Sequence, residues 1–184
     1  MMVKKGIIII LLIDFNEYIV RNFKNINRGE YNILTIRVDD LTDNRTIELI
    51  NAHLAGMAEN SPSESIHALN VGGLKRDNVT FYSAWENEEI MGCGALKELT
   101  TNHGEVKSMR TVEKHLKKGV ARAILQHIIN EAKMRGYTKI SLETGSMEAF
   151  QPACRLYESF RFTYCEPFDK YTDDPNSLFM TLNL

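Results

Sequence analysis

The 184-residue chain has few cysteines and lacks a long hydrophobic run. Cys93, Cys154 and Cys165 are far apart and form no CxxC pair, so neither a disulfide framework nor a cysteine-ligated zinc site is expected. The apolar run at 7–13 is much too short to span a bilayer. The net charge of −2 gives no general attraction to nucleic acid. We therefore expect a cytoplasmic protein with reduced thiols, no stable membrane insertion and no nucleic-acid partner.

The N-terminal residues need a separate interpretation. Lys4 and Lys5 precede the apolar run, as at the start of a signal peptide, but the run ends at Asp14 and no small-residue cleavage site follows. We predict that 1–31 form an extension outside the fold, with a membrane-associated or exported form as the alternative. Residues 32–184 then form one domain.

The hydrophobic periodicity predicts an α/β protein. Strands are predicted at 33–38, 79–85, 90–99, 105–111, 137–145, 162–166 and 178–183, and helices at 43–57, 63–70, 115–134 and 151–160. Gly72 and Gly73 are expected to end the second helix. Gly92 and Gly94 lie inside a predicted strand and indicate a bulge or a close backbone approach. This order predicts a twisted, mostly antiparallel mixed sheet of six to seven strands with about four helices on its faces.

The turn Lys117-Lys118-Gly119 joins a predicted strand to the third helix, whose apolar residues recur every three to four positions. A strand, a glycine turn and a helix start direct backbone N–H groups and the helix dipole at a phosphate. The nucleotide motifs GxxxxGK[ST] and GxGxxG are absent. The basic residues near this turn suit a small polyphosphate; they are Lys107, Arg110, Lys114, Lys117, Lys118 and Arg122.

Four segments together resemble the GNAT superfamily of N-acetyltransferases over about 33–184. They are EVKSMRT (105–111), KKGVARAIL (117–125), SLETG (141–145) and PACRLYESFRF (152–162). Within the superfamily, SMRT, LETGS, PACRLYESF and DDPNSLFM resemble a small bacterial subgroup of the YsnE type. The resemblance implies a GNAT-like fold and transfer of an acetyl group from acetyl-CoA, as co-substrate, to a primary amine of a small molecule or peptide.

The resemblance also implies where the co-substrate lies. Its pyrophosphate would be held by the backbone N–H groups of Lys117, Lys118, Gly119, Val120, Ala121 and Arg122. The side chains of Lys117, Lys118 and Arg122 would add positive charge. The main chain of Met109, Arg110 and Thr111 would bind the pantetheine arm.

The same resemblance assigns Tyr157 the role of general acid that returns a proton to the leaving thiolate. Periodicity alone would make Tyr157 an aromatic core residue. A base is needed for the amine, and Glu143 and Glu105 are the candidates because each lies at a strand end near the expected cleft. The alternative for both is a solvated surface carboxylate.

Other side chains are weaker candidates. Cys154 could act as a nucleophile, although a lone helix cysteine is more often a small buried hydrophobe. His103 and His115 have no cysteine or carboxylate at ligand spacing, so no metal is expected, and His115 is predicted to be a surface residue.

The acceptor and the activity are less defined. The loop 166–177 carries Glu166, Asp169, Asp173 and Asp174, which would attract a cationic acceptor or form a solvated connector. Leu116, Phe150 and Arg161 depart from the residues usual in the family, which motivates the alternative of a non-catalytic acyl-CoA binding or sensing domain. A homodimer is left open.

Overall fold

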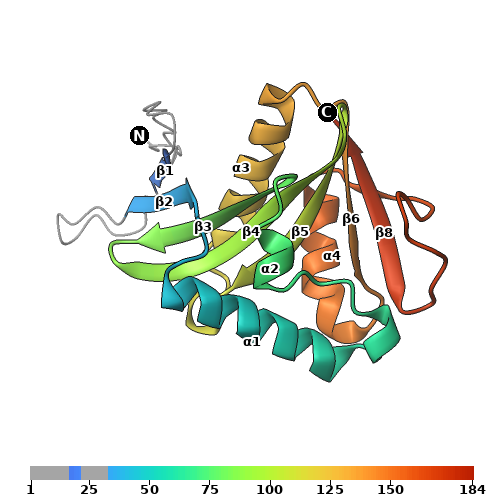
Figure 1. Ribbon diagram of the computed structural model, residues 1–184, viewed down its shortest axis with the longest axis horizontal. Coiled ribbons are helices and arrows are strands. Elements are labelled where there is room, and N and C mark those ends of the chain that lie inside the picture. Colours follow the sequence, from blue (N-terminus) through green and yellow to red (C-terminus); the bar gives the residue numbers. More distant parts are fainter. Residues whose placement is uncertain (1–16, 22–32) are drawn as a thin grey trace, which may run out of the picture.

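The computed structural model describes residues 17–21 and 33–184, and Figure 1 shows its elements. The strands are β1 (Glu17–Arg21), β2 (Ile33–Val38), β3 (Val79–Glu86), β4 (Glu89–Thr100), β5 (His103–Thr111), β6 (Lys139–Gly145), β7 (Thr163–Tyr164) and β8 (Ser177–Asn183). The helices are α1 (Asn44–Asn60), α2 (Val71–Leu74), α3 (Val120–Met134) and α4 (Gln151–Ser159).

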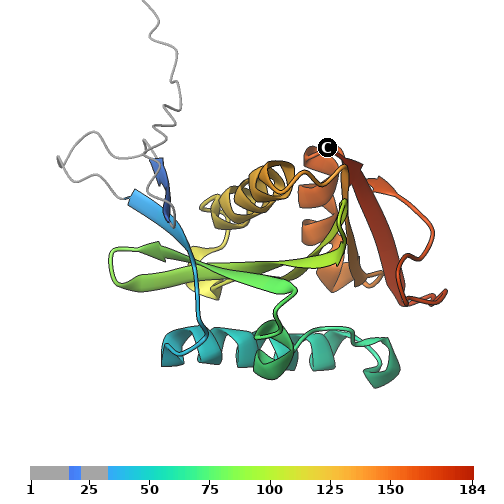
Figure 2. The same cartoon turned by 45° about the horizontal axis from the view of Figure 1, so that its top comes forward.

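The strands form one sheet in the order β1-β2-β3-β4-β5-β6-β8-β7. Every pair is antiparallel except β5 with β6. Figure 2 shows α1 and α2 on one face of the sheet and α3 and α4 on the other. The predicted α/β fold with a mostly antiparallel sheet is confirmed, and the described sheet has one strand more than predicted.

The added strand is β1, which pairs with β2. It comes from the segment 1–31 that the sequence placed outside the fold. Most of that segment, 1–16 and 22–31, lies outside the described residues, so its relation to the domain stays a prediction.

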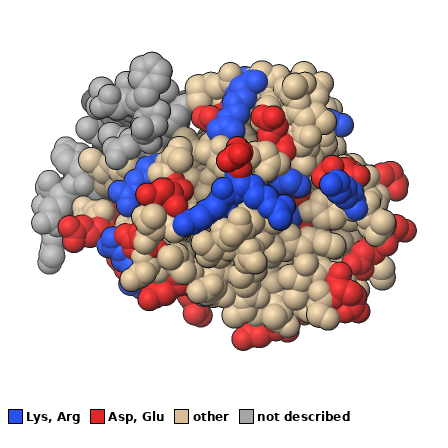
Figure 3. All heavy atoms as spheres, in the orientation of Figure 1, with Lys and Arg blue, Asp and Glu red and all other residues tan. Residues whose placement is uncertain are grey.

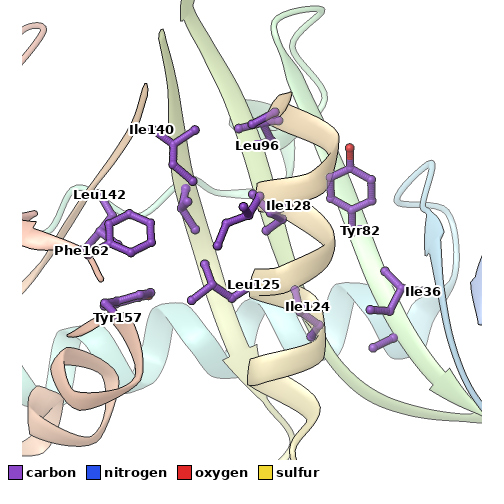
Figure 4. Close-up of a cluster of buried hydrophobic side chains, with 14 of the residues drawn as sticks. Ile36, Tyr82, Leu96, Ile124, Leu125, Ile128, Ile140, Leu142, Tyr157 and Phe162 are labelled. Carbon is purple, nitrogen blue, oxygen red and sulfur yellow. The ribbon is translucent and has the colours of Figure 1, made fainter. Parts of the chain in front are cut away.

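The larger core lies between the sheet and the helices α3 and α4, as Figure 4 shows. Ile124, Leu125 and Ile128 form the apolar stripe of α3 and are fully buried. Burying each such side chain stabilises the fold by about 1.5–3 kcal/mol. A second cluster, which includes Leu49, Ile50, Phe81 and Cys93, joins α1 and α2 to the opposite face. Each face of the sheet is therefore covered by helices that pack on it through a hydrophobic cluster.

The structure corrects one helix. The segment 63–70 forms only a short 3-10 turn at Ser63–Ser65. The helix comes later, at Val71–Leu74, because the Asn70 side chain accepts a hydrogen bond from Gly73 N (2.8 Å) and caps a new helix there. Gly72 and Gly73 therefore lie inside α2 instead of ending a helix.

A bulge in β5 shifts its register against β4. Cys93 pairs with Arg110 and Ala95 with Lys107, so β5 advances three residues while β4 advances two. Ser108, at φ 53°, takes up the extra residue. A Cβ on Gly94 would lie 2.6 Å from Met109 Sδ, and one on Gly92 would lie 2.7 Å from the Arg110 carbonyl oxygen. Both the bulge and the close approach expected from these glycines are confirmed.

Candidate active site

The candidate site lies where β5 and β6 separate. Their parallel pairing ends at Val106 and Leu142, whereas β5 continues to Thr111 and β6 to Gly145. Figure 1 shows the two strands side by side near the C-terminus and apart at the other end. The edge of β5 that faces β6 is therefore unpaired from Lys107 onward. Its backbone groups are available to an extended ligand.

The loop after β5 presents backbone amides at the separated end of the strands. The N–H groups of Lys117 and of residues 119–122 donate to no described residue. Gly119 (φ 86°) is the N-cap of α3, and Lys117 (φ 61°) also has a positive φ. Uncapped amides at the start of a long helix, together with its dipole, favour an anion.

Met109, Arg110 and Thr111 lie on the part of β5 whose edge toward β6 is unpaired, and on the other edge Arg110 and Thr111 pair with β4. The Met109 side chain contacts the core on the α3 side. The Arg110 side chain lies on the opposite face, against α1, because Arg110 Nη1 is 3.3 Å from the position of a Cβ on Gly56. The main chain and the side chain of Arg110 thus face different sides of the sheet.

Three of the six basic side chains grouped in the sequence are engaged with different protein partners. Lys107 Nζ lies 3.2 Å from Glu105 Oε1, on the face opposite the α3 core. Lys114 pairs with Glu89. Arg122 Nη2 donates to Ser159 Oγ (2.8 Å) and its guanidinium lies over Phe160.

His115 is buried (4% exposed) instead of lying on the surface as predicted. Its Nδ1 is 3.1 Å from Lys118 Nζ, and its Nε2 is 3.2 Å from Glu89 Oε1. The imidazole lies between these two groups because the 3-10 turn at Glu113–His115 carries it inward. His115 thereby ties the loop before α3 to the start of β4.

Tyr157, near the end of α4, lies beside Leu142 and Phe162 in the core, as Figure 4 shows. Leu142 is the last β6 residue that pairs with β5, so Tyr157 lies at the point where the strands separate. Burial, then the nearby Cys154 and Glu143, raise the pKa of Tyr157 above its usual value. Tyr157 therefore keeps its proton at neutral pH.

Glu143 is the first β6 residue beyond the paired segment, and it lies on the face opposite the α3 core. Its Oε1 accepts a hydrogen bond from Ser177 Oγ (2.9 Å), and no cation of the described chain lies within 4.0 Å. Burial raises the pKa of Glu143, while Lys107, Ser177 and His67 oppose that rise. A carboxylate with a raised pKa suits proton transfer near neutral pH.

Glu105 lies on the same face but is fully buried and surrounded by donors. Lys97 Nζ is 3.0 Å from its Oε2, Lys107 Nζ is 3.2 Å from its Oε1, and the Tyr171 hydroxyl donates to Oε1 at 2.5 Å. Lys107 Nζ also donates to the Tyr171 hydroxyl oxygen (2.7 Å). Glu105 is thus the centre of an internal ion-pair network and not the solvated surface carboxylate that was the alternative to its role as base.

Tyr171, which no sequence motif singled out, comes from the loop 166–177 and packs edge-on against His67. Asp169 of that loop pairs with Lys97 (3.5 Å), and Asp174 accepts hydrogen bonds from Asn176. Two of the four acidic side chains of this loop therefore have partners within the protein, whereas Glu166 and Asp173 are exposed. On the face shown in Figure 3, Lys and Arg atoms gather in the middle and many Asp and Glu atoms lie along the margins.

Cys154 is buried (1% exposed), and burial raises the pKa of its thiol. Because the thiolate is the nucleophilic form, a protonated buried thiol is a poor nucleophile. The burial of Cys154 therefore gives no support to its role as a nucleophile.

The fold and the sequence comparison agree on a class. The chain matches the model of the acetyltransferase (GNAT) family over residues 44–162. It therefore belongs to the GNAT family of acetyltransferases, as the sequence motifs predicted.

Two relatives match most of the chain. It is 60% identical to the uncharacterized N-acetyltransferase YsnE of Bacillus subtilis (strain 168) over 149 residues, which are 81% of this chain and 99% of YsnE. It is 46% identical to the uncharacterized N-acetyltransferase YedL of Escherichia coli (strain K12), covering 83% of this chain and 96% of YedL.

A solved structure supports the fold. A GNAT family acetyltransferase from Elizabethkingia anophelis with acetyl-CoA bound superposes with a TM-score of 0.60 at 20% identity, covering 82% of this chain and 98% of that one. Among the helices that the structure describes, none has the length and apolar character to cross a membrane.

Proposed function

We propose that this protein transfers an acetyl group from acetyl-CoA to a primary amine by direct attack in a ternary complex. The observation that carries the proposal is the row of unpaired amides at Lys117 and 119–122, placed where β5 and β6 separate. These groups fit a diphosphate, and the free edge of β5 at 109–111 fits the amide groups of a pantetheine arm. The bound thioester would supply the acetyl group.

Glu143 accepts the proton that the acceptor ammonium must lose before its nitrogen can attack. Its burial and its single hydrogen bond, from Ser177, leave the carboxylate able to take a proton. As the amide bond forms and the carbon–sulfur bond breaks, Tyr157 donates its proton to the thiolate, and the second proton that the attacking nitrogen loses restores the Tyr157 hydroxyl. Glu105 is the other carboxylate candidate, but its two lysine partners and Tyr171 favour a positioning role.

A small-molecule or peptide amine is the proposed acceptor. The exposed Glu166 and Asp173 of the loop 166–177 support an acceptor that approaches as a cation. A cytoplasmic location and a homodimer stay predictions.

The proposal is tested by following thiol release with acetyl-CoA and a panel of amines. Tyr157→Phe should lower kcat about 100-fold because it removes the proton donor, while the affinity for acetyl-CoA measured by calorimetry stays unchanged. Tyr164→Phe is the matched control, since Tyr164 is exposed and its hydroxyl donates to Glu158.

A non-catalytic acyl-CoA binding domain would give a different result. The wild-type protein would bind acetyl-CoA and release no thiol with any amine. An absence of calorimetric heat with coenzyme A would reject both functions.

A further inference from the structure

The Arg110 side chain lies on the face opposite the α3 core and has no use in the proposed binding of acetyl-CoA. Its guanidinium group lies against α1 at Gly56, where the missing side chain leaves room for it. The neighbouring backbone of β5 is the edge that would hold the pantetheine arm. The main chain of Arg110 therefore faces the proposed acetyl-CoA site, while its guanidinium group lies on the opposite face of the sheet, against α1.

The guanidinium group of Arg110 has no counter-charge in the described chain. No described carboxylate lies within 4.0 Å of it, and it makes no hydrogen bond to a described residue. The residue is half-buried. Because partly buried charges in proteins are usually paired, a guanidinium group left without an anion indicates that the anion comes from elsewhere.

The nearby ion-pair network does not supply that anion. It contains two cations, Lys97 and Lys107, and two carboxylates, Glu105 and Asp169, so its formal charge is zero. Arg110 on β5 and Glu143 on β6 are left as two groups of opposite sign on the separated strands. Among the described residues, Glu143 has Ser177 as its hydrogen-bond partner, and the Arg110 side chain has none.

His53 adds a neutral donor beside Arg110. It lies three residues before Gly56 on α1, hence on the same side of the helix. Burial, then the charges of Arg110 and Lys107, lower the pKa of His53 to about 4. Its imidazole is therefore neutral at pH 7, where it can donate one N–H without adding charge.

We propose that the acceptor is an amino acid whose carboxylate binds Arg110 and His53 while its amine faces Glu143. This inference rests on the proposed acetyl transfer and names its substrate class. The guanidinium fork matches a carboxylate with two parallel hydrogen bonds. One unmatched positive charge also suits a monoanion better than a phosphate dianion.

The test compares matched acids and amides as acceptors. Glycine, β-alanine, 4-aminobutyrate and 6-aminohexanoate are assayed against their primary amides, which keep the amine and lose the charge. The wild-type enzyme should prefer at least one acid over its amide by about 30-fold in kcat/KM, the size expected for a desolvated charge pair. Arg110→Met should abolish that preference by lowering the rate on the acid alone, and Arg110→Lys should restore part of it.

Arg155→Met is the matched control, because Arg155 is exposed on α4. It should keep the preference for the acid. Calorimetry with coenzyme A should give equal affinities for all variants, since the Arg110 main chain is unchanged. Equal rates on acids and amides in the wild-type enzyme, or an equal loss on both in Arg110→Met, would overturn the assignment.

Failure of the proposed function would look different, because no amine of either kind would release thiol. The subsite is then tested by titrating 6-aminohexanoate into the complex with coenzyme A and following the His53 ring resonances. A shift that is present in wild type and lost in Arg110→Met supports the subsite. No shift, or the same shift in both proteins, rejects it.

Discussion

Glu105 and Glu143 lie on one face of neighbouring strands, yet their surroundings are opposite. Glu105 belongs to the segment where β5 and β6 still pair, and two lysines and a tyrosine surround it. Glu143 belongs to the segment where the strands have separated, and a single serine hydroxyl contacts it. The first carboxylate is satisfied by the protein, whereas the second has one hydrogen-bond partner among the described residues, which supports its proposed role as base.

The difference indicates that the paired segment of β5 and β6 contributes to stability, whereas the separated segment provides the proposed site. A fully buried charge is tolerated only when protein partners replace its water. Through Lys97 and Tyr171, Glu105 therefore joins β5 to β4 and to the loop 166–177. A half-buried carboxyl with one partner keeps a raised pKa and spare lone pairs, which suit proton transfer. Three substitutions test this division.

The largest effect is expected for Glu143→Gln, which should lower kcat/KM by about 10²–10⁴-fold because it removes the proposed base. In the wild-type enzyme, activity should fall as the pH drops through a pKa that lies above the ordinary 4.5, since the base must be ionised. The variant should lack that acid limb. Both are read from pH–rate profiles of thiol release.

The stability of Glu143→Gln should be equal to or above that of the wild type at neutral pH. Because folding raises the pKa of Glu143, its contribution to stability is greatest below pH 4.5 and declines as the pH rises through the raised pKa. Thermal unfolding measures this, with Glu148→Gln as the exposed control. A large drop in Tm would mean that Glu143 is a structural residue instead.

Glu105→Gln should act mainly on stability. Removing the charge of Glu105 leaves Lys107 without a carboxylate and Lys97 with Asp169 alone, and breaking such a network costs about 3–5 kcal/mol of unfolding free energy. Urea unfolding gives that value, and kcat/KM per folded molecule should stay within about tenfold of wild type. Unchanged stability with lost turnover would make Glu105 the base and reverse the comparison.

The smallest effect is expected for Ser177→Ala, which removes the hydrogen bond that Ser177 donates to Glu143. The serine hydroxyl stabilises the ionised carboxylate, so its loss should raise the pKa of Glu143 further. The acid limb of the pH–rate profile should move to higher pH. At high pH the rate should stay within about threefold of wild type, since one neutral hydrogen bond contributes about 0.5–1.5 kcal/mol. An acid limb that does not move would mean that the ionisation of Glu143 does not control the rate.

The sequence predicted the parts of the site that are local in the chain. The turn at Lys117-Lys118-Gly119, the helix after it and the helix with Tyr157 follow from glycine, charge and periodicity within short windows. The partners of Glu105 could not be predicted in this way, because Tyr171 lies 66 residues away in the sequence. The placement of His53 near Arg110 likewise depends on how α1 crosses the sheet.

Two other failures have local causes that the pattern does not reveal. Asn70 could have ended one helix or begun another, and only its hydrogen bond to Gly73 N shows that it begins α2. The residue at which β5 bulges, Ser108, was not predicted either, although Gly92 and Gly94 on the partner strand indicated that a bulge would occur.

The extra residue at Ser108 reverses the odd–even order of side chains along β5. In a regular strand, Lys107 and Met109 would share a face, and Arg110 would point into the hydrocarbon core beneath α3. With the insertion, the thioether enters that core and the guanidinium group joins Lys107 on the other side. A straightened β5 that kept Ser108 would therefore exchange an apolar side chain and a charged one between the two sides of the sheet, whereas deletion of Ser108 would leave Met109 and Arg110 on the sides they occupy now.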